Sequence, residues 1–221
     1  MTTATPQRRD RGFTKWDLLI VILAVVMLVA VFLLLPYVAG YSSMSKSRRI
    51  TCVLHLKTVG LGLLIYANDH EDRFPWQTPT NAEGSLEYAL TGEVFRHFQA
   101  ASNEIGMTKY LLCPSDTTRV PASNFAPGFG NSNLSYFIGL DASGTNVQMI
   151  LSGDRLITVN GNARTGVVSV FSTNVVGWSS LLHGGHGNIG LADGSVQQVS
   201  PGALQSQAGA AQAPVFRLAI P

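Results

Sequence analysis

Two histidines and an aspartate, His183, His186 and Asp193, lie close together near the C-terminal end, in the run LLHGGHGNIGLADGSVQQVS. Imidazole and carboxylate groups are ligands of zinc, and carboxylates also bind calcium, so one interpretation is a metal site serving a metal-dependent hydrolase. Two glycines separate the histidines and prevent a fixed helical spacing, and an aspartate before a glycine commonly stabilises a turn. We therefore expect a structural role for these residues, with His183 hydrogen-bonded across to a hairpin, and no cofactor.

Other candidates for catalysis are few. The sequence contains no nucleophile elbow, no phosphate-binding glycine loop and no cluster of cysteine ligands. Asp154 and Arg155, in the run LSGDR, form either an ion pair or a solvent-exposed turn between strands. We therefore expect that the chain is not an enzyme.

The charge balance gives no reason to expect a nucleic-acid partner. The chain has 15 basic and 13 acidic residues, and Arg8, Arg9, Arg11 and Asp10 all lie in the first 12 positions. The rest of the chain is balanced, with 12 residues of each sign. The basic excess lies just before an apolar block, where the positive-inside rule keeps the N-terminus in the cytoplasm.

The C-terminal run also has the pattern of a β-hairpin. Residues 188–192 and 195–199 flank Asp193-Gly194, a pair typical of tight primed turns, which require positive φ. A helix is expected at about 86–98, and the segment 201–221, low in bulky residues, is expected to be a flexible tail. Four earlier runs, punctuated by Gly, Asn and Asp, predict short strands over 135–140, 147–151, 156–159 and 167–171.

Two helical segments are expected near the N-terminus. Residues 18–35 form an unbroken apolar block, long enough at about 1.5 Å per residue to cross most of a hydrocarbon core about 30 Å thick. Pro36 is expected to kink or interrupt the helix. Over residues 50–66 apolar side chains recur mostly at every third or fourth position, as one buried helical face requires. Gly60 and Gly62 in this segment either weaken the helix or let another backbone lie close.

Asp17 stands at the head of the apolar block and needs an explanation. A carboxylate without a partner in the hydrocarbon costs on the order of 2.5–3.5 kcal/mol. In an ordinary signal anchor its side chain would reach back to the interface. A cleaved secretory signal would have a shorter apolar region and a small-residue cleavage site, so it fits this long block less well.

The order Gly12-Phe13, followed by an acid at Asp17, resembles the N-terminal segment of type IV pilins and type II secretion pseudopilins. The resemblance implies that a prepilin peptidase cuts after Gly12 and that the new N-terminal residue, Phe13, is methylated. It also implies that Asp17 meets the α-amine of a neighbouring subunit in a bundle of staggered helices. The chain departs from the family in having aspartate in place of the usual glutamate, and Lys15-Trp16 in place of a more apolar pair.

Three further segments resemble pilin-like proteins that carry an H-X9-DG motif. His183, nine residues and then Asp193-Gly194 reproduce that motif, and CVLHLKTVGLGLLIYANDHEDRFP and LLCPSD are similar to two other segments of the family. The resemblance implies an α+β fold, in which a long N-terminal helix, transmembrane in its first half, packs on a small antiparallel β-sheet. The expected divisions are a cytoplasmic leader (1–12), a transmembrane segment (13–36), an exported amphipathic continuation of the helix (37–73), an exported globular domain (74–200) and the tail (201–221).

The expected function is structural, as a subunit of a type II secretion-like or type IV pilus-like filament. The expected partners are the prepilin peptidase and N-methyltransferase, other pilin-like subunits, a secretion or pilus assembly platform and the lipid membrane. The expected location is the bacterial inner membrane, with a cytoplasmic N-terminus and the C-terminal domain in the periplasm or on the cell surface. The alternatives are an anchored, exported binding module that does not polymerise, and the metal-dependent hydrolase based on His183, His186 and Asp193.

Cys52 and Cys113 both fall on the exported side in this topology, where disulfides persist. A bridge between them would close a loop of about 60 residues and stabilise the chain by roughly 4 kcal/mol. Two buried free thiols are the alternative, because the sequence does not show how far apart the two Cα atoms lie.

Overall fold

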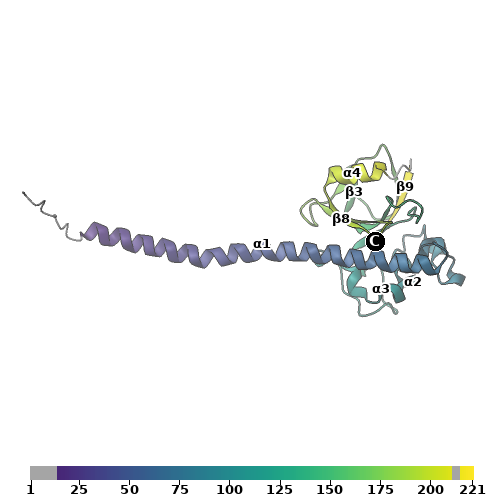
Figure 1. The fold of residues 1–221 in the computed structure, drawn as a ribbon, viewed down its shortest axis with the longest axis horizontal. Helices are drawn as coiled ribbons and strands as arrows, with labels where there is room; N and C mark the ends of the chain where they lie inside the picture. The colour runs from purple at the N-terminus through teal and green to yellow at the C-terminus, as the bar shows by residue number, and fades with distance from the viewer. Residues whose placement is uncertain (1–13, 211–214) are drawn as a thin grey trace, which may run out of the picture. The chain divides into compact units, whose positions relative to one another are not determined.

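The computed structural model describes residues 14–210 and 215–221, with the backbone alone for residues 36–45 and 210. The chain divides into two compact units, Met1–Ser45 and Lys46–Pro221. Helix α1 (Lys15–Asp69) contributes to both units, and it includes Pro36, which therefore does not interrupt the helix (Figure 1). The expected leader and its processing positions, Gly12 and Phe13, lie outside the described residues.

The first unit contains the most apolar part of α1, over Lys15–Leu35. Large apolar side chains are exposed along this whole segment, and none of its most apolar window is buried. Trp16 and Phe32, for example, are each 75% exposed. A helix that is apolar on all sides requires an apolar environment, and this one is long enough to cross a membrane.

The second unit contains the rest of α1, over Lys46–Asp69. This segment is also long and apolar enough for a membrane span, but 44% of its most apolar window is buried inside the unit. Its larger buried side chains recur at every third or fourth position, which is the spacing of a single helical face. They are Cys52, Leu56, Val59, Leu63 and Tyr66. The segment is therefore the core helix of the second unit.

Two antiparallel sheets complete the second unit. The larger sheet has six strands in the order β5-β9-β1-β2-β7-β8, and the smaller has three in the order β4-β3-β6. The sheet is thus larger than the small one expected. The strands are β1 (Tyr136–Gly139), β2 (Ile150–Asp154), β3 (Ile157–Val159), β4 (Asn162–Ala163), β5 (Gly166–Phe171), β6 (Val176–Trp178), β7 (Gly187–Leu191), β8 (Val196–Val199) and β9 (Val215–Ile220).

Apolar side chains cover both faces of the large sheet. Successive residues of a strand point to opposite faces, so Tyr136 and Ile138 of β1 join the buried cluster of α1, whereas Phe137 joins a second cluster. The second cluster also holds residues of β3, of β6 and of helix α4 (Pro201–Ala210). The large sheet therefore lies between α1 on one side and α4 with the small sheet on the other (Figure 1).

Short helical turns fill the region between α1 and β1. The single helix expected at 86–98 is wrong, because Gly92 adopts a left-handed conformation with φ of 79° and separates η3 from α2. The elements here are η1 (Pro75–Gln77), η2 (Thr80–Ala82), η3 (Leu86–Tyr88), α2 (Phe95–Ala100), α3 (Ser102–Ile105), η4 (Thr108–Leu111) and η5 (Asn131–Asn133).

Within the segment expected to be a flexible tail, 201–221, the described residues 201–210 and 215–221 are instead part of the fold. Residues Pro201–Ala210 form α4, and β9 pairs with β5 on one side and with β1 on the other. Phe216, Leu218 and Ile220 of β9 alternate into the second cluster. Their apolar pattern was hidden because the preceding small residues dominate the average composition of the segment.

The expected hairpin at Asp193-Gly194 is confirmed, but its primed turn is wrong. Strands β7 and β8 pair in antiparallel register, with Ile189 opposite Gln197. Of the two turn residues only Gly194 has positive φ, at 81°, whereas a type I′ turn requires it at both. The Gly194 N–H donates to Leu191 O, so the loop ends with a left-handed glycine after an ordinary turn.

The two glycines of the core helix have different surroundings. A Cβ atom on Gly62 would lie 2.8 Å from Ile105 Cγ1 and 3.1 Å from the Ile105 backbone nitrogen. A Cβ atom on Gly60 would meet nothing within 4 Å. Gly62 thus permits the close approach of α3, whereas Gly60 only weakens the helix.

Alanine at these two positions should therefore have opposite effects. Gly60→Ala should raise the free energy of unfolding of the second unit by about 0.5–1 kcal/mol, because alanine has the higher helix propensity. Gly62→Ala should lower it by roughly 1–2 kcal/mol, because α3 must move to make room. Thermal unfolding followed by circular dichroism checks both variants, and effects of the same sign would contradict this difference in packing.

His97 is a buried histidine in the core of the second unit. It is 1% exposed, and its Nδ1 lies 2.7 Å from Ser85 Oγ. Burial lowers the pKa of His97 from 6.5 to about 4. The folded protein therefore keeps this ring neutral at pH values where the unfolded chain protonates it.

The second unit should consequently lose stability as the pH falls from 6.5 towards 4, because the unfolded state then binds a proton that the folded state excludes. The loss attributable to His97 should reach about 3 kcal/mol near pH 4. The difference in unfolding free energy between the natural chain and His97→Asn, measured from pH 7 to pH 4, isolates this contribution. A difference that does not change with pH would show that another group is responsible.

Candidate functional site

The start of α1 carries the first candidate site. Thr14 precedes the helix, and the Asp17 N–H donates to Thr14 Oγ1 at 3.3 Å. In return, the Thr14 N–H and the Thr14 hydroxyl both donate to Asp17 Oδ2, at 2.9 and 2.6 Å. This reciprocal arrangement is a capping box, which satisfies backbone groups that the first helical turn leaves free.

The capping box explains how an acid can stand before the apolar block. Asp17 has a partner in its own chain, and its negative charge lies at the positive end of the helix dipole. Both hydrogen bonds that it accepts use Oδ2, so Oδ1 takes no part in the box. The spacing Thr-x-x-Asp was visible in the sequence, but Thr14 was not identified as a functional residue.

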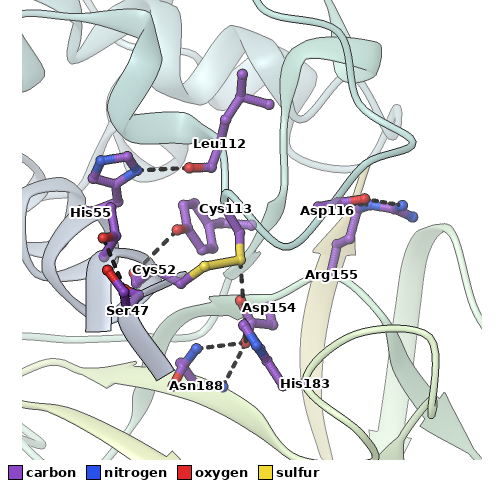
Figure 2. The surroundings of a disulfide bond; sticks show 12 residues. Ser47, Cys52, His55, Leu112, Cys113, Asp116, Asp154, Arg155, His183 and Asn188 are labelled. Atoms are coloured by element: carbon purple, nitrogen blue, oxygen red, sulfur yellow. Dashed lines mark hydrogen bonds and ion pairs between the residues drawn. A yellow bond between two sulfur atoms is a disulfide. The ribbon is translucent and has the colours of Figure 1, made fainter. Parts of the chain in front are cut away.

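A disulfide between Cys52 and Cys113 forms the centre of a second, buried cluster (Figure 2). Of the two alternatives left open by the sequence, the structure contains the bridge. It joins α1 to the segment that follows η4, and the two cysteines are 0% and 2% exposed. Close by, Tyr136 Oη donates to Cys52 O at 3.2 Å, and His55 Nδ1 lies 2.7 Å from Leu112 O.

His183 reaches this disulfide from the loop before β7. Its Nε2 lies 3.4 Å from Cys113 Sγ and 3.5 Å from Asp154 Oδ2 (Figure 2). Its backbone has φ of 53°, in the left-handed region, and its carbonyl accepts a hydrogen bond from Arg49 Nη2 at 2.9 Å. A histidine held in this sparsely populated conformation must be fixed by its surroundings.

Asp154, at the end of β2, is completely buried beside this histidine. Its Oδ2 accepts hydrogen bonds from the backbone N–H and the side-chain Nδ2 of Asn188, at 2.7 and 2.9 Å. Burial raises the pKa of Asp154 to about 7, and burial followed by the nearby Arg49 charge lowers the pKa of His183 to about 4. Both shifts favour neutral forms, so the contact between the two side chains is not a full ion pair.

Arg155 and Asp154 do not pair with each other, and they do not form a solvent-exposed turn. Arg155 instead makes a bidentate ion pair with Asp116, through Nε at 2.7 Å and Nη2 at 3.0 Å (Figure 2). The two side chains are 11% and 2% exposed. Although burial by itself raises the pKa of Asp116, the hydrogen bonds and charge of Arg155 together with Thr118 hold it below its ordinary value.

The structure does not assemble the three residues of the metal-site hypothesis. His186 and Asp193 are exposed, and Asp193 Oδ1 accepts the Ser195 N–H within the turn, as a structural aspartate does. His183 is buried against Asp154 and Cys113, so its expected hydrogen bond to the hairpin is replaced by these contacts. Over residues 14–210 and 215–221, the group of His, Cys, Asp or Glu that converges closely enough for a metal is Cys52, Cys113 and His183.

The buried cluster connects segments that lie far apart in the sequence. It joins α1, the LLCPSD segment, the end of β2 and the loop before β7. The sequence identified Cys52, Cys113 and His183 as candidate residues. It did not indicate that Asn188 and Arg49 are part of the same buried cluster. Because the cysteines, His183 and Asp154 are all buried, the cluster fixes these segments to one another.

An open hollow lies elsewhere on the second unit. It has a volume of about 500 Å³. Trp76 contributes an indole whose buried Nε1 has no hydrogen-bond partner among the described residues. The lining residues are Trp76, Gln77, Leu86, Ala89, Leu90, Leu140, Asp141 and Arg217. Apolar, amide and charged groups thus line the same hollow.

No family model matches the sequence. Neither the curated proteins nor the solved structures provide a match.

Proposed function

We propose that this chain is a pilin-like or pseudopilin-like subunit, anchored in the bacterial inner membrane and assembled into a type II secretion-like or type IV pilus-like filament. The observation that carries the proposal is an all-round exposed apolar helix headed by an exposed acid, Asp17. Such a helix must be covered by lipid or by other helices of the same kind. The resemblance of Gly12-Phe13 to a prepilin cleavage site supports cover by other helices of the same kind.

The proposed mechanism begins with cleavage after Gly12 by a prepilin peptidase and methylation of Phe13. The capping box would survive this cleavage, because it uses only Thr14 and Asp17. Asp17 Oδ1, which the box does not use, would then accept the α-amine of a neighbouring subunit. Two charges that pair away from water attract strongly, although their desolvation offsets much of the gain, so the pair fixes register more than it adds stability.

The topology follows from the charges before the helix. Arg8, Arg9 and Arg11 precede the apolar segment, so the positive-inside rule places the N-terminus in the cytoplasm and Lys46–Pro221 outside it. A disulfide in the second unit agrees with an oxidising compartment. Packing between helices in lipid gives less free energy than burial from water, so assembly needs many subunits and a defined register.

The first test is the intact mass and N-terminal fragmentation of the full chain extracted from the membrane of its native host. A chain that begins at Phe13 and carries one added methyl group is the expected result. A chain that still carries Arg8, Arg9 and Arg11 would contradict the proposal and reduce Lys15–Leu35 to a simple anchor.

A pair of variants separates the two roles of the N-terminal acid. Thr14→Val breaks the capping box but keeps the carboxylate, whereas Asp17→Asn removes the charge and keeps a hydrogen-bond acceptor. If Asp17 pairs with a neighbour, Asp17→Asn should reduce cross-linked oligomers in the membrane at least about tenfold, the effect of losing a charged hydrogen bond, and Thr14→Val should not. Equal effects of the two variants would show that Asp17 serves only as a helix cap.

A second candidate function is an anchored binding module that does not polymerise, and the hollow beside Trp76 is the observation that favours it. In that case Asp17→Ala would leave the biological function intact without any oligomer. Leu90→Asp, which places a charge on the rim of the hollow, would instead abolish the biological function. A functional Leu90→Asp chain would argue against the binding module.

A further inference from the structure

We infer that the buried cluster is a zinc site in the reduced chain: Cys52, Cys113, His183 and Asp154 bind one Zn²⁺ when the disulfide is opened. The bridge and the metal are then alternative cross-links of the same segments. This inference is independent of filament assembly, because it concerns only the second unit.

The donor set is the first argument. Two thiolates, an imidazole and a carboxylate are all ligands that zinc takes in proteins, usually four in a tetrahedral arrangement. The sulfur atoms of Cys52 and Cys113 and a ring nitrogen of His183 all lie within 4.8 Å of one another. The carboxylate of Asp154 lies next to the same ring nitrogen. Three ligands from three segments thus converge at one place, and Asp154 lies beside the imidazole of this group.

The distances between these ligands are the second argument. Bonds of about 2.0–2.3 Å around a tetrahedral zinc place neighbouring ligand atoms roughly 3.3–3.8 Å apart. His183 Nε2 already lies 3.4 Å from Cys113 Sγ and 3.5 Å from Asp154 Oδ2. Reduction leaves two separate thiols, which move apart to a non-bonded distance. Separation of the two sulfurs from bonding distance to about 3.8 Å is therefore the main movement that zinc coordination requires.

The surroundings of Asp154 are the third argument. Asn188 donates both of its hydrogen bonds to Oδ2, which fixes the orientation of the carboxylate as outer-shell groups do around metal sites. The other oxygen, Oδ1, is buried without a hydrogen-bond partner among the described residues. A buried carboxylate oxygen without a donor is costly, and a cation bound by the same carboxylate would offset that cost.

Charge balance is the fourth argument. A zinc ion with two thiolates, one carboxylate and a neutral imidazole carries a single net negative charge. The positive charge of Arg49 would compensate this negative charge, since the Arg49 guanidinium donates a hydrogen bond to the His183 carbonyl. The exposed His186, although close in sequence, is not part of this arrangement.

The chemistry balances with a dithiol as the reductant. The dithiol gives two electrons and two protons to the disulfide, which becomes two thiols, while the dithiol becomes a cyclic disulfide. Binding of Zn²⁺ then releases the two thiol protons, together with any proton that the Asp154 carboxyl holds. Exchange with an external disulfide reverses the process, reforms the Cys52–Cys113 bond and releases the metal.

The test uses the full chain in detergent, reduced with a dithiol that is then removed without oxygen, and titrated with Co²⁺ as a spectroscopic substitute for Zn²⁺. The expected result is one metal per chain with thiolate-to-cobalt charge-transfer bands and the visible bands of a tetrahedral site. The same chain with its disulfide intact should show neither. Reduced, folded protein without thiolate–cobalt bands would overturn the inference.

Three variants then identify the other ligands, with circular dichroism to verify that each remains folded. His183→Gln should weaken zinc binding more than about 100-fold, beyond the effect of losing an outer-shell group, and Asp154→Asn should weaken it at least about tenfold. His186→Gln is the matched control and should bind like the natural chain. If His183→Gln and Asp154→Asn also bind like the natural chain, the cysteines hold the metal without them and the proposed site is wrong.

Discussion

Replacement of Cys52 and Cys113 together by alanine should lower the free energy of unfolding of the Lys46–Pro221 unit by about 4 kcal/mol, because the bridge closes a long loop in the unfolded chain. The two cysteines are 61 residues apart in the sequence. For a unit of this size the corresponding fall in melting temperature is roughly 8–16 °C. Thermal unfolding in detergent, followed by the near-ultraviolet circular dichroism of the buried tryptophans, measures it.

Reduction of the natural chain in the presence of a metal chelator is the matched control. It breaks the same bond without changing any side chain, so it should reproduce the effect of the double variant. Addition of zinc to the reduced chain should recover part of the loss if the thiols bind the metal with His183. A double variant that unfolds within about 1 kcal/mol of the natural chain would show that the loop is already constrained in the unfolded state.

Replacement of Arg155 by methionine should lower the free energy of unfolding by about 3–5 kcal/mol, because it leaves the buried carboxylate of Asp116 without its ionic partner. The Asp116 side chain is only 2% exposed, and the Thr118 hydroxyl would remain as a donor, with the Ser135 hydroxyl beside it. Chemical denaturation at neutral pH measures the loss. The second change Asp116→Asn should recover part of it, since it removes the unpaired charge.

Arg217→Met is the matched control for this prediction. Arg217 also pairs with an aspartate, Asp141, but these side chains are 43% and 25% exposed. The cost of breaking an exposed pair is typically below about 1 kcal/mol. Equal losses in Arg155→Met and Arg217→Met would contradict the claim that burial makes the Arg155 pair important.

The pH dependence of the Arg155 variant provides an independent check. In the natural chain the pKa of Asp116 is below its ordinary value, so its contribution to stability is present above about pH 4 and is lost as the pH falls through the folded pKa. Without Arg155, burial alone would raise that pKa. The variant should therefore lose stability as the pH rises above about 4, and a profile parallel to that of the natural chain would contradict this reasoning.

Local patterns in the sequence determined the elements whose signals are short in range. The unbroken apolar block of 18–35 predicted a helix long enough to cross a membrane, and the structure has such a helix there. The three- and four-residue spacing of 50–66 predicted a buried helical face. Asp193-Gly194 predicted a hairpin, because a left-handed glycine between apolar runs leaves few other conformations. In each case the deciding interaction lies within a few residues along the chain.

Only the tertiary structure decided how distant segments combine. The strand β9 could not be predicted, because its place between β5 and β1 depends on partners far away in the sequence. The same is true of Asp116, which pairs with Arg155, and of Asn188, which fixes Asp154. The sequence identified His183 as a residue with chemical potential, but its neighbours are set by long-range packing, which brings it to the disulfide and away from His186 and Asp193.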